Sequence, residues 1–116
     1  MAIITNLIKL IDNEPRISHR IIAEQTGNDE KSVSRIIRNN MDKFEKFGRV
    51  GFEIQSENEV KEKQKTNPNY RAEKTYFLNE PQATLLLTFM RNNEIVINFK
   101  VRLVQEFFKM RTQLKI

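Results

Sequence analysis

The sequence predicts a mainly α-helical fold with a small β component, and three observations support this prediction. Ala23, Gly27 and Val33 have the spacing of two helices joined by a tight turn. Two short segments with β propensity follow, separated by a long polar stretch. The rest of the chain is rich in apolar residues at helical spacing. Together these features predict a winged helix-turn-helix with two C-terminal helices.

Composition limits the classes of protein to which the chain can belong. Its 116 residues suit one domain, which we divide into a winged helix-turn-helix-like part over 1–79 and a helical part over 80–116. With no cysteine and one histidine, we expect no disulfide, no metal site and no cofactor. The formal charge of +5 favours a polyanionic partner, nucleic acid before membrane. We find no transmembrane segment or signal peptide and expect a protein of the cytoplasm.

The N-terminal segment favours a hairpin over a helix. Residues 3–11 have apolar residues at helical spacing, but residues 12–15 have the composition of a turn between two short strands. Ser18 is suited to cap a first helix that ends near Thr26. His19 is expected to be exposed or to lie in the cap region, without a catalytic or metal-binding role, because it has no partner ligand.

The second helix is expected to begin after a cap at Asn28 or Asp29 and to continue to Phe47. Its apolar stripe, expected to be core, comprises Val33, Ile36, Ile37, Met41, Phe44 and Phe47. A recognition helix offers its first turns to the major groove, so the candidate DNA contacts on this helix are Lys31, Ser32, Ser34, Arg35 and Arg38. Asp29 and Glu30 stabilise the helix N-terminus but would repel phosphate unless one accepts a proton from a cytosine amino group.

A strand pair with a long connection is predicted after the second helix. Apolar and polar residues alternate over 50–54, and a returning strand is predicted over 74–78. The connection, 55–73, is polar and rich in Lys and Glu, which predicts a mobile loop. As a basic wing, this unit would contact DNA phosphates through Lys61, Lys63, Lys65, Arg71 and Lys74. The interspersed glutamates favour the alternative of a solvated loop that does not touch DNA.

Two further helices are predicted in the C-terminal part. Residues 79–81 start the first, whose leucines make it apolar around most of its circumference, so we expect it to be buried. The final helix, from about Glu94 to Gln113, has two apolar flanks. One flank would pack on its own domain. The other would either form a homodimer through 94–114 or be covered by residues 81–91 and the N-terminal hairpin.

Several segments, taken together, have the residue order of one known family. They are Arg16-Ile-Ser18, Ala23-Glu-Gln-Thr-Gly27, Phe47-Gly-Arg-Val-Gly-Phe-Glu-Ile54, Arg91-Asn-Asn-Glu-Ile-Val96 and Phe99-Lys100, with Phe77-Leu-Asn-Glu-Pro-Gln-Ala-Thr-Leu-Leu-Leu-Thr88 as the most specific. Over nearly its whole length the chain resembles the Rha family of phage regulatory proteins. The resemblance implies a phage or prophage regulator with an N-terminal winged helix-turn-helix-like module, often followed by a separate C-terminal domain. It implies no catalytic residues.

Two functions are consistent with these features. The first is a transcriptional regulator that occupies an operator in double-stranded DNA, with Arg35 or Arg38 reading guanine edges. The second is an antirepressor-like module that binds a repressor or a host regulator through its C-terminal helix and does not need DNA. We expect no enzymatic activity, because the sequence has no phosphate-binding glycine loop and no recognisable pair of nucleophile and base.

Overall fold

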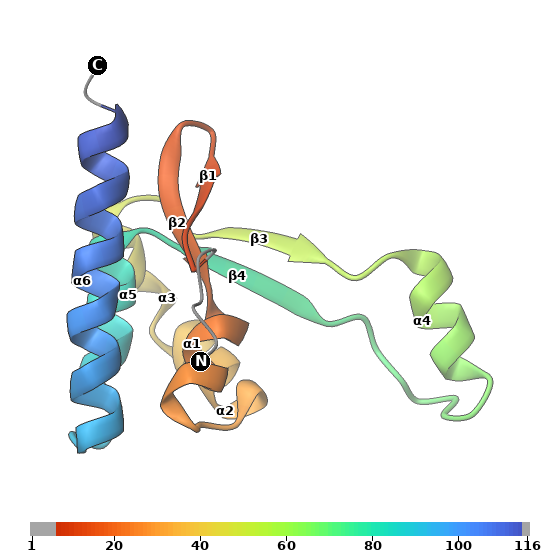
Figure 1. The fold of residues 1–116 in the computed structure, drawn as a ribbon. Helices are drawn as coiled ribbons and strands as arrows, with labels where there is room; N and C mark the ends of the chain where they lie inside the picture. The colour runs from red at the N-terminus through yellow and green to blue at the C-terminus, as the bar shows by residue number, and fades with distance from the viewer. Residues whose placement is uncertain (1–6, 115–116) are drawn as a thin grey trace, which may run out of the picture.

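The computed structural model describes residues 7–114 and has a mixed α/β fold (Figure 1). The helices are α1 (His19–Thr26), α2 (Glu30–Asn39), α3 (Met41–Phe44), α4 (Glu57–Gln64), α5 (Glu80–Thr88) and α6 (Glu94–Leu114), with the 3₁₀ turn η1 (Glu45–Phe47) after α3. The strands are β1 (Lys9–Ile11), β2 (Glu14–Ser18), β3 (Gly51–Ile54) and β4 (Lys74–Leu78). They form one antiparallel sheet in the order β1-β2-β4-β3. The prediction of a mainly α-helical fold is therefore only partly right, because the two predicted strand pairs join into a single sheet.

Strands β1 and β2 form the predicted N-terminal hairpin. Ile11 pairs with Glu14, which leaves a two-residue turn at Asp12 and Asn13. Both turn residues have positive φ, 53° and 65°, as the turns that match the twist of a hairpin require. Asparagine and aspartate tolerate this region, so the sequence at the turn selects the hairpin. Residues 3–6 of the predicted first strand lie outside the described residues.

Helices α1 and α2 are joined by a tight turn at Gly27. Ser18 and Asp29 cap the two helices with their side-chain oxygens, as predicted. Gly27 has a φ of 70°, a left-handed conformation that ends α1 without a Cβ clash. Ala23 is buried between the helices, where its small side chain allows α1 and α2 to approach each other.

The second helix is shorter than predicted. It ends at Asn39, because Asn40 leaves the helical region with φ −125° and ψ 25° while its Nδ2 donates to the Ile36 carbonyl at 2.8 Å. Asparagine often competes in this way with the helical hydrogen bonds. The chain continues as α3 and η1, so the predicted stripe is not continuous. Phe44 is fully buried, whereas Phe47 is 48% exposed.

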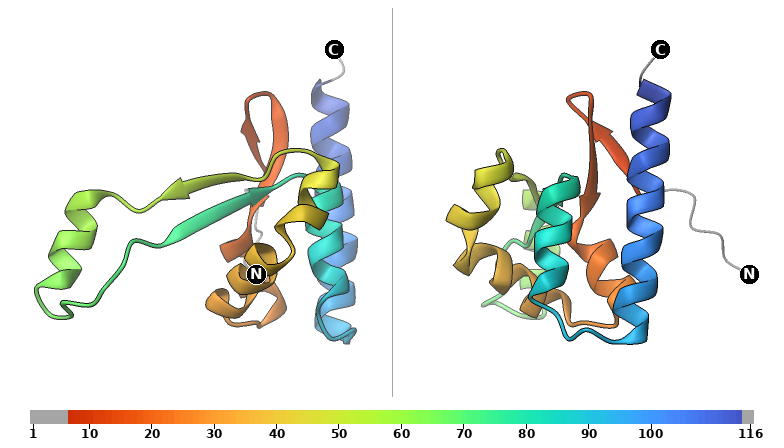
Figure 2. Two further views of the ribbon diagram at one scale, coloured as in Figure 1. Left: turned by 180° about the vertical axis from the view of Figure 1, so that it is seen from behind. Right: turned by 90° about the vertical axis from the view of Figure 1, so that its left-hand side faces the viewer.

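Strands β3 and β4 form a hairpin that projects from the body of the protein and carries α4 at its tip (Figures 1 and 2). The predicted loop over 55–73 therefore contains a helix. Ser56 caps α4 by accepting a hydrogen bond from the Glu59 N–H at 3.2 Å. None of the residues of α4 is buried, so this helix depends on its cap and on side-chain pairs one turn apart rather than on packing.

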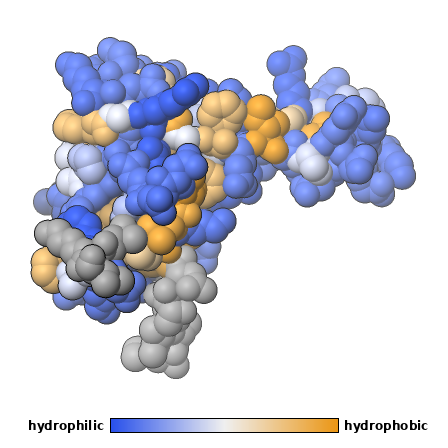
Figure 3. Space-filling model, turned by 90° about the horizontal axis from the view of Figure 1, so that it is seen from above, coloured by the Kyte–Doolittle hydropathy of each residue, from blue (hydrophilic) through white to orange (hydrophobic). Residues whose placement is uncertain are grey.

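Strand β3 is more exposed than its alternating pattern predicted. Phe52 and Ile54 are 52% and 55% exposed. β3 is an edge strand of the sheet, and the hairpin extends away from the helices, so these side chains stay about half exposed. Seen from above, apolar atoms interrupt the polar surface of the projecting hairpin (Figure 3).

Helix α6 packs against α5 and α1 at one side of the molecule (Figure 2). One of its two predicted apolar flanks is buried, with Val96, Phe99, Leu103 and Phe107, while the second flank is exposed and is not covered by residues 81–91 or the N-terminal hairpin. Neither α6 nor any other described helix is long and apolar enough to cross a membrane.

Gln82 ties α5 to the connection between α3 and β3. The side chain is fully buried, and its Oε1 accepts a hydrogen bond from the Asn79 N–H at 2.9 Å, which completes the capping box of α5. Its Nε2 donates to the carbonyls of Phe44 and Gly48 at 3.2 and 2.8 Å. The Gln82 side chain therefore makes hydrogen bonds to three backbone groups, one at the start of its own helix and two in the distant segment 44–48.

We expect Gln82→Leu to lower the free energy of unfolding by about 1–3 kcal/mol, because leucine keeps the apolar volume but leaves buried backbone groups without this partner. Urea denaturation midpoints measure the change. Gln113→Leu, at an exposed position of α6, is the control and should leave the midpoint unchanged. A Gln82→Leu midpoint equal to that of the wild type would contradict the role assigned to this network.

Candidate functional site

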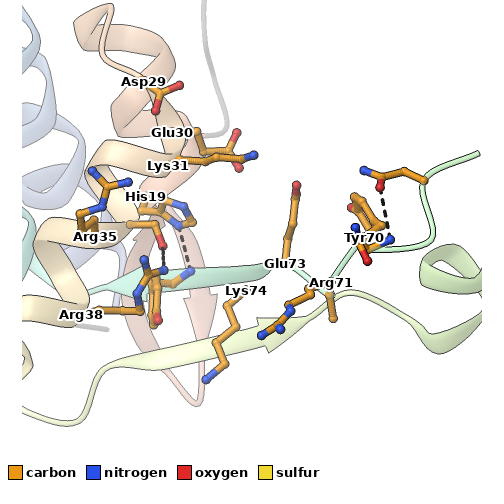
Figure 4. Close-up of a pocket in the computed structure, with 15 residues that line it drawn as sticks. His19, Asp29, Glu30, Lys31, Arg35, Arg38, Tyr70, Arg71, Glu73 and Lys74 are labelled. Atoms are coloured by element: carbon orange, nitrogen blue, oxygen red, sulfur yellow. Dashed lines mark hydrogen bonds between the residues drawn. The ribbon is translucent and has the colours of Figure 1, made fainter. Parts of the chain in front are cut away.

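A cleft of about 700 Å³ lies between α2 and the segment that leads into β4 (Figure 4). Its lining residues from α1, α2 and the α1–α2 turn are His19, Asp29, Glu30, Lys31, Ser34, Arg35 and Arg38. Those from the second segment are Asn67, Asn69, Tyr70, Arg71, Ala72, Glu73, Lys74 and Tyr76. The cleft thus brings the predicted recognition helix next to the predicted wing.

Basic side chains dominate the exposed surface of the cleft. The exposed cations are Lys31, Arg35 and Arg38 on α2, and Arg71 and Lys74 beside them. Within residues 7–114, none of these groups forms an ion pair with a carboxylate. Lys74 Nζ lies 4.8 Å from the centre of the Phe52 ring, a cation–π contact that orients the amine. These cations remain available to an anionic ligand.

The acidic residues of the cleft have local partners. Arg20 on α1 lies between two of them, with Nε 3.1 Å from Glu30 and Nη2 3.0 Å from Glu73. Asp29 accepts hydrogen bonds from the N–H and the hydroxyl of Ser32, at 3.0 and 3.2 Å. The acidic start of α2 is therefore occupied by a helix cap and by Arg20, and the cleft keeps an excess of positive charge.

His19 lies in the cap region of α1, one of the two predicted alternatives, but its side chain is buried against β4 and not exposed. It is 1% exposed, and its Nδ1 accepts a hydrogen bond from the Tyr76 backbone N–H at 3.0 Å. This N–H belongs to strand β4 where the strand passes the start of α1, and it needs an acceptor there. Burial, together with the charge of Arg20, lowers the pKa of His19 to about 4. The imidazole is therefore neutral at pH 7, with its proton on Nε2, and adds no charge to the cleft.

Most of the predicted contact residues meet in the cleft, but two serines differ in their roles. The predicted residues that line it are Lys31, Ser34, Arg35, Arg38, Arg71 and Lys74. Ser34 is buried, 9% exposed, and its Oγ accepts a hydrogen bond from Arg38 Nη1 at 2.9 Å. Ser34 therefore supports Arg38 instead of projecting from the flank of the helix as predicted. Ser32 is exposed beside the cleft, with its hydroxyl bonded to Asp29.

The predicted lysines of the wing tip lie on α4 or directly after it and do not line the cleft. Lys61 and Lys65 form ion pairs with glutamates of the same helix at 3.3 and 3.0 Å. Lys63 Nζ lies 5.5 Å from the centre of the Tyr70 ring. Because the glutamates of α4 offset its lysines, the tip of the hairpin has little net charge.

Among the polar residues of the cleft that the sequence did not indicate are Asn67, Asn69 and Tyr70. The Tyr70 hydroxyl donates to Gln55 Oε1 at 2.8 Å, and Gln64 Nε2 donates to the Tyr70 carbonyl at 2.9 Å. These bonds hold the segment between α4 and β4 against the hairpin. The one feature of the sequence that could have indicated this contact is Tyr70 itself, a single aromatic residue in a polar stretch, because a tyrosine usually packs against a surface.

Comparison with known proteins gives one informative result. Residues 17–112 match the family model described as phage regulatory protein Rha. Neither the curated proteins nor the solved structures provide a match. All residues that line the cleft lie inside the matched range.

We expect the pH dependence of stability to include a contribution from His19. Between about pH 6.5 and 4 the unfolded chain binds a proton at His19 and the folded protein does not. The contribution of His19 to the free energy of unfolding is thus fully present above pH 6.5. As the pH falls to about 4, proton binding by the unfolded chain lowers the free energy of unfolding by on the order of 2–3 kcal/mol.

His19→Gln tests this expectation, because the amide oxygen can accept the Tyr76 hydrogen bond but does not titrate. Free energies of unfolding measured from about pH 7 to 4 should fall less in the variant than in the wild type. Parallel curves for the two proteins would exclude a role of His19 in the pH dependence.

Proposed function

Because the chain belongs to the phage regulatory protein Rha family, we propose that it is a phage- or prophage-encoded transcriptional regulator that occupies operator DNA. Membership confirms the resemblance inferred from the sequence and gives the chain a phage regulatory role. The observation that carries the DNA-binding part of the proposal is the cleft, where exposed cations of α2 and of the β3–β4 hairpin face the same space. A duplex presents phosphates on both sides of its grooves, and such a surface matches that pattern.

In this proposal α1 and α2 act as a helix-turn-helix, with α2 as the recognition helix. Lys31, Arg35 and Arg38 follow one another at intervals of one helical turn and share one face of α2. The first turns of α2 enter the major groove, which is wide enough for a helix. Arg35 and Arg38 then reach guanine O6 and N7 edges, and the contact with Ser34 restricts the rotamers of Arg38.

The β3–β4 hairpin acts as the wing. Arg71 and Lys74 contact phosphates beside the groove and fix the position of the protein without reading sequence. Lys61 and Lys65 contribute less than the sequence suggested, because each is already paired within α4. The regulator acts by occupancy, so we assign it no catalytic step and no catalytic residue.

We also propose that the regulator works as a homodimer through 94–114, because two copies can bind two half-sites one helical turn of DNA apart. The alternative is a protein that binds a repressor or a host regulator without DNA. The negative charges of Asp29 and Glu30 favoured this alternative, because they would repel DNA phosphates. In the structure Asp29 caps α2 through Ser32 and Glu30 is paired with Arg20, so part of this acidic charge is offset.

We expect Arg35→Ala to weaken binding to a selected operator by about 1–3 kcal/mol and to relax the preference at one base pair, because a bidentate contact is lost. Operators are obtained by selecting bound duplexes from a random library, and fluorescence anisotropy titrations give the affinities. Lys61→Ala is the matched control, since it also removes one positive charge but does so on α4, and it should change the affinity little.

The salt dependence of the affinity for DNA distinguishes the two candidate functions. Wild-type affinity for random duplex should fall steeply with salt, because each neutralised phosphate releases counterions. Lys74→Ala should reduce that slope by about one and weaken binding to all sequences similarly. If neither Arg35→Ala nor Lys74→Ala changes the affinity for any duplex, the groove model is wrong. Negligible binding at every salt concentration would favour the protein-binding alternative.

We expect Arg20→Gln to weaken binding to random and selected duplexes alike, by about fivefold, or roughly 1 kcal/mol. The variant leaves Glu30 and Glu73 without their shared partner, and their charges then repel the phosphates. Replacing both glutamates by glutamine in the Arg20→Gln background should restore most of the affinity.

This rescue separates two explanations. If the triple variant binds no better than Arg20→Gln, then Arg20 does not act by neutralising the glutamates. Circular dichroism of each variant checks that a change in affinity does not come from loss of the fold.

A further inference from the structure

Helix α6 has a second apolar stripe that no element of residues 7–114 covers. Its side chains are Ile97, Val101, Val104 and Phe108, with exposures of 44%, 53%, 46% and 61%. The spacing between successive members is four, three and four residues, which is the spacing of a coiled-coil seam. Throughout this article this set is called the outer stripe.

The outer stripe is separate from the face of α6 that belongs to the core. The core face consists of Val96, Phe99, Leu103 and Phe107, none of which is more than 4% exposed. α6 stands at one side of the molecule (Figures 1 and 2). The outer stripe is thus not an incompletely covered margin of the core, and its apolar area is available to a partner.

Opposite charges lie at the two ends of the outer stripe. Glu94 precedes Ile97 by three residues and Arg111 follows Phe108 by three, so both continue the seam. Glu94 is exposed and forms no ion pair in the described part of the chain. The guanidinium of Arg111 lies 5.9 Å from the centre of the Phe108 ring and also pairs with Glu80 of α5.

We propose that a second copy of this chain covers the outer stripe, with the two α6 helices antiparallel. A two-fold axis between Val101 and Val104 maps the seam onto itself. The pairs across the interface are then Ile97 with Phe108, Val101 with Val104, and Glu94 with Arg111. A parallel pair would instead bring like charges together at both ends. The charges therefore select the antiparallel arrangement, and the apolar side chains supply the contact.

This inference deepens the homodimer of the proposed function, but the interface itself needs no DNA. Its tests are made without DNA, so they can succeed while the operator model fails, or fail while Arg35→Ala still weakens binding to a duplex. A repressor or other protein that occupies the outer stripe is the competing outcome, and in that case the purified chain is monomeric.

Disulfide cross-linking tests the orientation, because the chain has no cysteine of its own. Ile97→Cys and Phe108→Cys are prepared separately, one with a tag that changes its mass, then mixed and oxidised. Antiparallel pairing gives a cross-link between the two variants and little between copies of either one. Efficient cross-linking of Ile97→Cys to itself would overturn the antiparallel arrangement, as would equal yields for every combination.

Sedimentation over a range of concentrations tests the interface itself. We expect a wild-type dimer and, for Val101→Asp, a dissociation constant raised by roughly tenfold or more, because the interface would bury an unpaired carboxylate in each copy. Ile95→Asp is the matched control, on the same helix and 58% exposed but outside the outer stripe, and should dimerise like the wild type.

Three results would overturn the proposal: a wild-type protein that is monomeric at all concentrations, a dimer that withstands Val101→Asp, or equal effects of Val101→Asp and Ile95→Asp. Val101 is half exposed, so we expect the variant to fold, and circular dichroism checks this.

Discussion

The fold depends on the position of strand β4 between β2 and β3. β4 pairs with β2 at one end and with β3 along its length. α1 begins where β2 ends and α5 begins where β4 ends, so this pairing sets the positions of both helical parts. Arg16 secures the junction, since its guanidinium donates to the carbonyls of Phe77 and Arg49 at 2.8 and 2.9 Å. These bonds allow a charged side chain to be almost completely buried there.

The same strand determines the shape and charge of the cleft. The backbone of β4 is bonded to His19, and Glu73, just before the strand, is paired with Arg20, so the start of α1 and the base of the hairpin are held together. Arg71 and Lys74 consequently line the same cleft as the basic residues of α2. Five basic side chains line the cleft, and Arg20 offsets part of the charge of Glu30 and Glu73, so a chain with a modest positive charge has one surface with an excess of cations.

Local signals predicted the element boundaries well, and their failures have identifiable causes. The end of α2 before Asn40 and the helix within 55–73 were not predicted, because both depend on weak local preferences. The first depends on an asparagine side chain that competes for a helical carbonyl, and the second on ion pairs one turn apart. Six of the ten candidate DNA contacts line one cleft in the structure. The structure differs from the prediction at Ser34, which is buried, and at the lysines of α4, which pair with glutamates. Neither the burial of Ser34 nor these ion pairs can be recognised before the helices are located.

The sequence by itself determined most of the helix and turn boundaries, the apolar stripes of α6 and the family. Ser18, Gly27 and Asn79 mark ends of helices because capping and left-handed turns are decided by a few neighbouring residues. Only the tertiary structure decided that His19 is buried and neutral, that Arg20 pairs with two glutamates, and that one stripe of α6 stays exposed. Each of these features depends on segments that are far apart in the chain. Burial and ion pairing arise only where such segments come together in space, and no local sequence pattern specifies this.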